Sequence, residues 1–111
     1  MRQEQFPRSE VLVLAEAVKY SEHSIVSRQV MKEAGGNITL FAFDGGQELS
    51  EHTAPFDALV QILDGRAEIS IAGREYRLEA GSAIIMPAGV PHAVRATEPF
   101  KMLLTMVRTP A

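Results

Sequence analysis

The chain contains 111 residues with no cysteine and a formal net charge of −3 at pH 7, which fits one domain and excludes disulfides, thiolate metal sites and a thiol nucleophile. Its lysine and arginine residues are scattered singly and its pI is about 5.6, so we expect no nucleic-acid partner. The apolar runs are too short to span a membrane and the first residues are polar, so we expect a soluble, cytoplasmic protein with no membrane partner.

The N-terminal part of the chain carries weak structural signals. Residues 1–9 are polar and predict a loosely held arm, which leaves residues 10–111 as the folded domain, with its central part at 37–107. Residues 11–14 form a short apolar run that predicts the start of a strand, and residues 15–19 have mild helical character. We expect the regular strands to begin only beyond this region.

The rest of the chain consists of short strand patterns separated by glycine or proline turns. The predicted strands cover 25–31, 37–43, 58–63, 67–71, a return segment containing Tyr76 and Leu78, 81–86 and 102–107. Residues 47–56 are polar and contain Pro55, so we expect a loop or a bulged entry into a strand there. No segment is long and periodic enough for a crossover helix. The pattern therefore predicts an all-β sandwich or barrel.

Alternation within the strands predicts which side chains share a face. In residues 37–43, one face holds Thr39, Phe41 and Phe43, and the other holds Ile38, Leu40 and Ala42. In residues 58–63, Leu59 and Leu63 point outward if Ala58 faces the interior. Because an apolar outer face requires a second layer from the same chain or from a partner, we expect a homodimer. Residues 10–31 are then expected to pair with, or lie across, the neighbouring subunit.

One stretch fixes a histidine in place. The segment from Gly81 runs through an apolar strand that must end at Pro87, because proline cannot donate a hydrogen bond within a central ladder. Gly89 allows a turn with positive φ, and Pro91 makes the approach to His92 rigid. We expect His92 to stand at a defined position beside the end of this strand.

The spacing of glycine, proline and histidine forms two motifs. The second motif is Gly, five residues, Pro, one residue, Gly, two residues and His. The residues that match it are Gly81, Pro87, Gly89 and His92. In the first, the matching positions are Gly46, His52 and Gly65. Together they resemble the motifs of the cupin superfamily of RmlC-like proteins, and residues 52–59 look like those of small, mostly uncharacterised single-domain bacterial cupins. The resemblance implies a single jelly-roll barrel, or double-stranded β-helix, of two antiparallel sheets.

The ligand set that the resemblance implies for a metal is incomplete. Metal-binding cupins use two histidines and a glutamate of the first motif together with the histidine of the second. Here Ala54 and Ala58 occupy two of these four positions, and only His52 and His92 remain. The resemblance thus implies at most one weakly held divalent ion, zinc, nickel, manganese or iron, on His52 and His92. Further candidate ligands are the nearby carboxylates Glu48, Glu51 and Asp57.

The motif positions also place His52 and His92 at one end of the barrel, close enough to share a metal, a water or a ligand group. The candidate residues for a central ligand pocket are His52, His92, Phe41, Phe43, Met86 and Met102. Aromatic and methionine side chains in a small barrel are more often core than pocket. The alanines at positions 54 and 58 favour a pocket slightly, because they leave room and lower polarity.

Three functions fit these observations. The first is a barrel that binds a small organic molecule in an apolar pocket, oriented by the two imidazoles. The second is a metal-dependent oxygenase or isomerase of the cupin type, and the third is a non-catalytic barrel that acts through its oligomer. The second and third depend largely on family analogy. The sequence identifies no catalytic residue and leaves open whether the protein is an enzyme.

Overall fold

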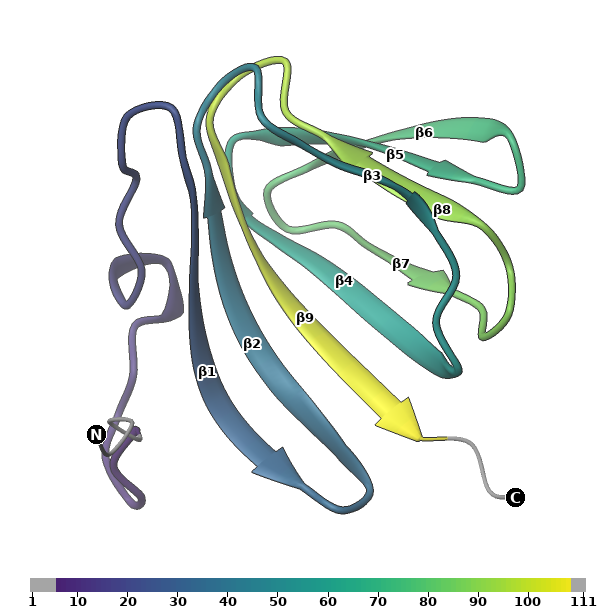
Figure 1. Ribbon diagram of the computed structural model, residues 1–111. Helices are drawn as coiled ribbons and strands as arrows, with labels where there is room; N and C mark the ends of the chain where they lie inside the picture. The colour runs from purple at the N-terminus through teal and green to yellow at the C-terminus, as the bar shows by residue number, and fades with distance from the viewer. Residues whose placement is uncertain (1–5, 109–111) are drawn as a thin grey trace.

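The computed structural model describes residues 6–108, and over this range the protein is almost entirely β-structure, as the sequence predicts (Figure 1). The elements are one 3₁₀ turn, η1 (Leu14–Glu16), followed by β1 (Ile25–Glu33), β2 (Gly36–Phe43), β3 (Glu48–His52), β4 (Phe56–Asp64), β5 (Arg66–Ile71), β6 (Arg74–Glu79), β7 (Ala83–Met86), β8 (His92–Arg95) and β9 (Phe100–Arg108). Residues 1–5 of the predicted arm lie outside the described range. Within that range, no helix is long and apolar enough to cross a membrane.

The prediction that a strand begins at residues 11–14 is wrong. Val11 is 96% exposed and Val13 is 57% exposed, and neither belongs to either sheet. Instead, the amide N–H groups of Glu16 and Ala17 donate to the carbonyls of Val13 and Leu14 and close the single turn of η1. A short apolar run forms a strand only when a neighbouring strand accepts it, and here none does.

The nine strands form two antiparallel sheets (Figure 1). Their orders are β1-β2-β9-β4-β7 and β3-β8-β5-β6. The chain crosses from one sheet to the other after β2, β4, β6 and β8 at one end of the barrel, which we call the closed end, and after β3 and β7 at the other end. At the opposite end β3 finishes at His52, β8 begins at His92, and β2 and β4 begin; we call this end the mouth.

The barrel interior is tightly packed at the closed end. Phe43 and Phe100 are fully buried there, and their rings stack with centroids 4.5 Å apart. The buried residues around them are mostly small or branched apolar side chains, among them Val60, Ile62, Ala67, Ile69, Leu78, Val94 and Ala96. Burial of this apolar surface is the main force that holds the two sheets together.

The predicted division of faces on β2 is confirmed. Phe41 and Phe43 contact the cluster between the sheets, whereas Leu40 and Ala42 belong to a second cluster on the outer face of the five-stranded sheet. Val18, which follows η1, is buried in this second cluster. The N-terminal segment of the same chain therefore supplies part of the second layer that an apolar outer face requires.

Polar contacts hold the N-terminal segment on the sheet. The Tyr20 hydroxyl donates to Asp64 Oδ2 at 2.6 Å, and Lys101 Nζ donates to the Ala15 carbonyl at 2.5 Å. Burial and this hydrogen bond to Asp64 raise the pKa of Tyr20, so the hydroxyl remains a donor. On β1, Arg28 donates to the Ala17 carbonyl at 2.8 Å. Together these contacts fix residues 15–20 against strands that are distant in the sequence.

The turn between β4 and β5 gives a first prediction. Gly65 has φ of +72°, and a Cβ added there would lie 2.2 Å from the Pro99 carbonyl oxygen. Gly73 has a similar φ of +79°, but its Cβ would meet open space. We expect Gly65→Ala to lower the free energy of unfolding by more than about 3 kcal/mol, because backbone must move as well as adopt an unfavourable φ.

The matched control is Gly73→Ala, which we expect to cost only about 1–2 kcal/mol, the steric cost of the left-handed conformation. Urea unfolding followed by circular dichroism measures both losses. Equal losses for the two variants would show that the close approach to Pro99 does not matter.

Candidate functional site

His52 and His92 lie side by side at the mouth, as the motif spacing predicts. They are direct cross-strand neighbours on β3 and β8. Their ring centroids are 4.4 Å apart and the ring planes meet at 66°. His92 is only 6% exposed and forms part of the wall, whereas His52 is exposed at the rim.

A bulge in β3 makes this pairing possible. Leu49 pairs with Val94 and His52 pairs with His92, so three residue steps on β3 match two on β8. In a regular strand Leu49 and His52 would point to opposite faces, because side chains alternate. The extra residue in the bulge turns His52 to the same face as Leu49. This outcome agrees with a bulged strand rather than a loop within residues 47–56.

Backbone carbonyls fix the proton on each imidazole. His52 Nδ1 lies 2.8 Å from the Ser50 carbonyl oxygen, and His92 Nδ1 lies 3.2 Å from the Val90 carbonyl oxygen. A carbonyl oxygen can only accept, so Nδ1 carries the proton in each neutral ring. Both Nε2 atoms are then left as acceptors. The pair thus offers two lone pairs for a ligand.

The wall opposite the histidines is one row of the five-stranded sheet. Asn37, Met106, Ala58 and Met86 are successive cross-strand partners on β2, β9, β4 and β7. Ala58 and Met86 are buried in the interior cluster and Met106 packs against it, so the row faces inward. Because β2 and β4 begin at the mouth, this row faces the same space as His52 and His92.

Asn37 is a polar residue of this wall that the sequence analysis does not single out. Its Oδ1 atom is buried and has no hydrogen-bond partner among the described residues. Its position follows the alternation of Thr39, Phe41 and Phe43, which places it on the inward face. That periodicity could have identified its direction, but not its lack of a partner.

The other predicted lining residues lie at different depths. Met86 is in the mouth row, whereas Met102 and Phe43 are buried toward the closed end. Phe41 is the cross-strand partner of Met102, is partly buried, and has its ring 6.1 Å from that of Phe43. Among the predicted aromatic and methionine residues, only Met86 stands in the row that faces the imidazoles.

The candidate third metal ligands do not join the histidine pair. Asp57 Oδ1 accepts a hydrogen bond from the Ala88 amide at 2.9 Å. Glu48 and Glu51 line a shallow groove on the outer face of the four-stranded sheet, together with Glu68. Across residues 6–108, no three or more His, Cys, Asp or Glu side chains are grouped so as to hold a metal. The residues present therefore do not fit a centre with three or four protein ligands.

That outer groove has its own ionic network. Arg95 Nη2 donates to Glu68 Oε2 at 2.7 Å, and Arg77 Nη2 lies 3.4 Å from Glu68 Oε1. The hydrogen bond from Arg95 is the main cause that lowers the pKa of Glu68. Glu48 faces this network because it pairs with Arg95 across the strands, so its carboxylate lies on the side of the sheet away from the imidazoles.

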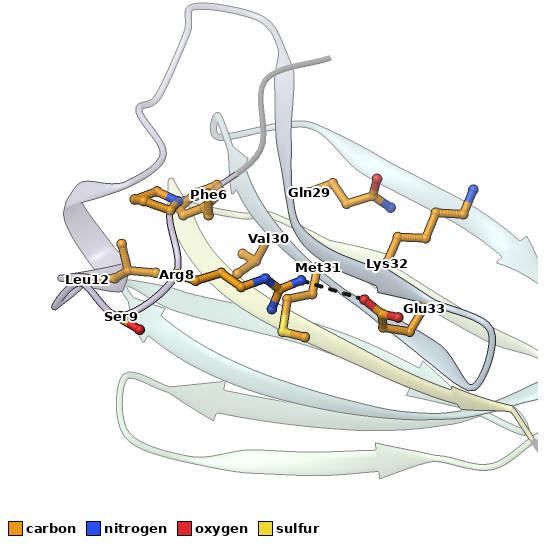
Figure 2. Close-up of a pocket in the computed structure, with 10 residues that line it drawn as sticks. Phe6, Arg8, Ser9, Leu12, Gln29, Val30, Met31, Lys32 and Glu33 are labelled. Carbon is orange, nitrogen blue, oxygen red and sulfur yellow. Dashed lines mark ion pairs between the residues drawn. The ribbon is translucent and has the colours of Figure 1, made fainter. Parts of the chain in front are cut away.

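A separate cavity lies on the outside of the barrel (Figure 2). It measures about 310 Å³ and is lined by Phe6, Pro7, Arg8, Ser9 and Leu12 of the N-terminal segment and by residues 29–33 of β1. Arg8 and Glu33 bridge it with an ion pair of 3.7 Å between two exposed side chains, a geometry that contributes little stability. Neither imidazole lines this cavity.

The match to known proteins identifies the family. Residues 39–107 match the family model described as a cupin domain. The chain belongs to the cupin family. This match spans both motifs and covers all or part of eight of the nine strands of the described range, β2 to β9.

Solved structures agree with this assignment. A protein of unknown function from Streptococcus pyogenes is 40% identical, with a TM-score of 0.91 over 100% of this chain and 98% of that one. A cupin superfamily protein from Desulfitobacterium hafniense is 28% identical, with a TM-score of 0.88 over 98% of this chain and all of that one. An uncharacterized protein of Streptomyces coelicolor is 30% identical over 64 residues, which are 58% of this cupin and 61% of that relative.

The two-histidine donor set yields a prediction about metal. We expect added zinc to bind weakly and to be removed by dialysis against EDTA without loss of the fold, because two imidazoles leave most coordination positions to water. His52→Ala should abolish this binding, whereas His23→Ala, in an exposed loop, should not change it. Isothermal titration with zinc measures the effect. Undiminished binding by His52→Ala would place the ligands elsewhere.

Proposed function

We propose that this cupin binds a small organic molecule at the mouth of its barrel, between the imidazoles of His52 and His92 and the row formed by Asn37, Met106, Ala58 and Met86. The observation that carries the proposal is the free Nε2 atom on each of two imidazoles whose rings lie 4.4 Å apart. His52 is exposed at the rim, but His92 is largely buried, and polar atoms of buried side chains normally have hydrogen-bond partners. A bound molecule supplies them.

Partial exposure of the interior near the mouth supports this proposal. Phe43 and Phe100 at the closed end are fully buried. In contrast, Ile71 beside His92, Met106 in the mouth row and Leu104 behind it are only partly buried, although they pack against the interior cluster. Apolar side chains that face inward and still reach solvent gain stability when a ligand covers them.

The two alanines in the first motif favour binding over metal chemistry. Ala58 stands where metal-binding cupins carry a glutamate, and its small side chain lies in the row opposite the histidines. The substitution removes a charge and leaves volume beside Met86 and Met106. An enclosed wall without carboxylates suits an uncharged ligand better than a cation.

Nuclear magnetic resonance tests this binding. We expect a panel of phenol, cyclohexanol, catechol and benzoate to include compounds that shift the imidazole ¹⁵N signals of His52 and His92 and the amide signals of Met86 and Met106. His92→Ala should remove these shifts, because it deletes a wall residue. His23→Ala is the control.

Two outcomes would count against the proposal. One is a panel in which no compound shifts signals at the mouth. The other is binding that shifts only the residues around the cavity of Figure 2 and is unchanged in His92→Ala.

An uncovered apolar surface on the outer face of the five-stranded sheet supports a second proposal. The N-terminal segment covers only part of the outer face of the five-stranded sheet, around Leu40, Ala42 and Leu63. Farther along the same sheet Ile85 is 62% exposed and Val107 is 55% exposed, and Leu59 lies beside Ile85 in register. We propose that a second copy of the chain covers this region, which makes the protein a homodimer.

Light scattering checks the oligomer. We expect twice the 12.2 kDa chain mass at micromolar protein and the monomer mass for Ile85→Lys, because a charge in an apolar interface is costly to bury. Glu79→Lys, on the other sheet, is the control for added positive charge. A parent protein that runs as a monomer would rule the dimer out.

A further inference from the structure

We infer that the molecule bound at the mouth is an organic anion, an apolar body that carries one carboxylate, and that Arg108 holds this carboxylate at the rim. The inference rests on the proposed binding at the mouth and names the class of its ligand. It starts from Arg108, which is the last residue of β9 and the cross-strand partner of Phe56 at the beginning of β4. Both residues therefore stand at the mouth end of the five-stranded sheet.

Alternation along the strands turns Arg108 and Phe56 toward the interior. Met106, two residues before Arg108, packs against the interior cluster, and side chains two residues apart share a face. The same step on β4 leads from the buried Ala58 to Phe56. The Arg108 guanidinium carbon lies 5.6 Å from the centroid of the Phe56 ring. A positive charge thus stands beside an aromatic surface at the entrance to the mouth.

The Arg108 guanidinium has no carboxylate partner among residues 6–108. Its backbone amide donates to the Gly35 carbonyl at 2.9 Å, which holds the end of the strand in place. A guanidinium presents its donors in a planar fork that matches a carboxylate. Arginines on the outside of the barrel have carboxylate partners within the chain, namely Arg8, Arg66, Arg77 and Arg95. A ligand carboxylate would give Arg108 the same kind of partner.

The other formal charges on the inward faces at this end are also positive. Lys32 on the edge strand β1 is the cross-strand partner of Asn37. Arg74 on the edge strand β6 is the partner of Ile71. Both side chains are exposed, and within residues 6–108 neither forms an ion pair. They add to the positive potential of the mouth from its two sides.

Carboxylates near the mouth are directed elsewhere. Asp57 accepts a hydrogen bond from the Ala88 amide, Glu51 lines the outer groove, and Glu33 pairs with Arg8 beside the external cavity. The mouth is therefore positive in the described part of the chain, although the whole chain has a net charge of −3. A concentration of one sign of charge attracts a ligand of the opposite sign.

The inner part of the same space favours an organic body on this anion. Met106, Ala58 and Met86 form an apolar wall one row inside Arg108. Two residues along a strand span about 7 Å, a length that one ring can cover. An inorganic anion would leave the apolar wall in contact with water, whereas a ring attached to the carboxylate would cover it. Only one of the three cations stands on a central strand, and a single carboxylate matches it.

A series of compounds with similar shape and different charge tests the anion. Benzoate is negative, benzamide is neutral and benzylamine is positive at pH 7. For the parent protein we expect benzoate to bind most tightly and benzylamine most weakly, measured by NMR titration of the Ala58 and Met106 amide signals. Acetate, which has the carboxylate without a ring, should bind more weakly than benzoate. Equal affinities for benzoate and benzamide would overturn the anion, and equal affinities for benzoate and acetate would overturn the organic body.

Arg108→Gln tests the contact itself, because it removes the charge and keeps most of the length. At about 0.15 M salt, where distant exposed charges are largely screened, it should weaken benzoate about tenfold, the effect of one charged hydrogen bond at an exposed position. Benzamide should change less than twofold. Arg77→Gln is the matched control, because it removes the same charge from the outward face of β6, and it should alter neither affinity. An unchanged benzoate affinity in Arg108→Gln would overturn the role of Arg108.

A measurement on the parent protein makes the test independent of whether the variant folds. The side-chain ¹⁵Nε signal of Arg108 should shift when benzoate is added and stay in place with benzamide, because only the carboxylate forms a charged pair with the guanidinium. A stationary Arg108 signal with benzoate bound would overturn its role. Phenol and benzamide that shift the mouth signals as strongly as benzoate would overturn the anion and leave binding at the mouth standing. No shift at any mouth residue with any compound would overturn both.

Discussion

The pairing of β3 with β8 is the constraint on which the site depends. Its bulge turns Leu49 and His52 to the same face, so that Leu49 packs in the interior while His52 meets His92. Without the extra residue, Glu51 would take the inward place of His52, because alternation is strict in a regular strand. A carboxylate would then face Met106 and Ala58 instead of an imidazole. One residue of register thus decides the chemistry of the mouth.

Much of the fold could be predicted from alternation and turn residues, because these are local signals. Residues 37–43 show a clear period of two and form β2 almost as predicted. β3 could only be predicted as a possible bulged entry, because Leu49 is its single aliphatic side chain and its pairing with β8 is a long-range contact. Residues 11–14 have the composition of a strand but no neighbour to pair with, and composition alone does not show this.

The candidate site also has features that the sequence could predict and features that it could not. The two histidines could be placed together because both stand at motif positions. The role of Asp57, Glu48 and Glu51 could not be settled from sequence, since the direction of a side chain near a bulge depends on the register of the partner strand. The free oxygen of Asn37 is a tertiary property, because it depends on which donors the fold brings near it.

The proposed ligand site and the exposed apolar surface share two central strands. On β4, Ala58 faces the mouth and Leu59 faces outward; on β9, Met106 and Val107 divide in the same way. A second copy that packs on Leu59 and Val107 would therefore restrain the same backbone that carries the inner wall. Close-packed β-strands transmit such restraint because their side chains have little free volume. Ligand binding and association through this sheet are thus expected to influence each other even though they use opposite faces.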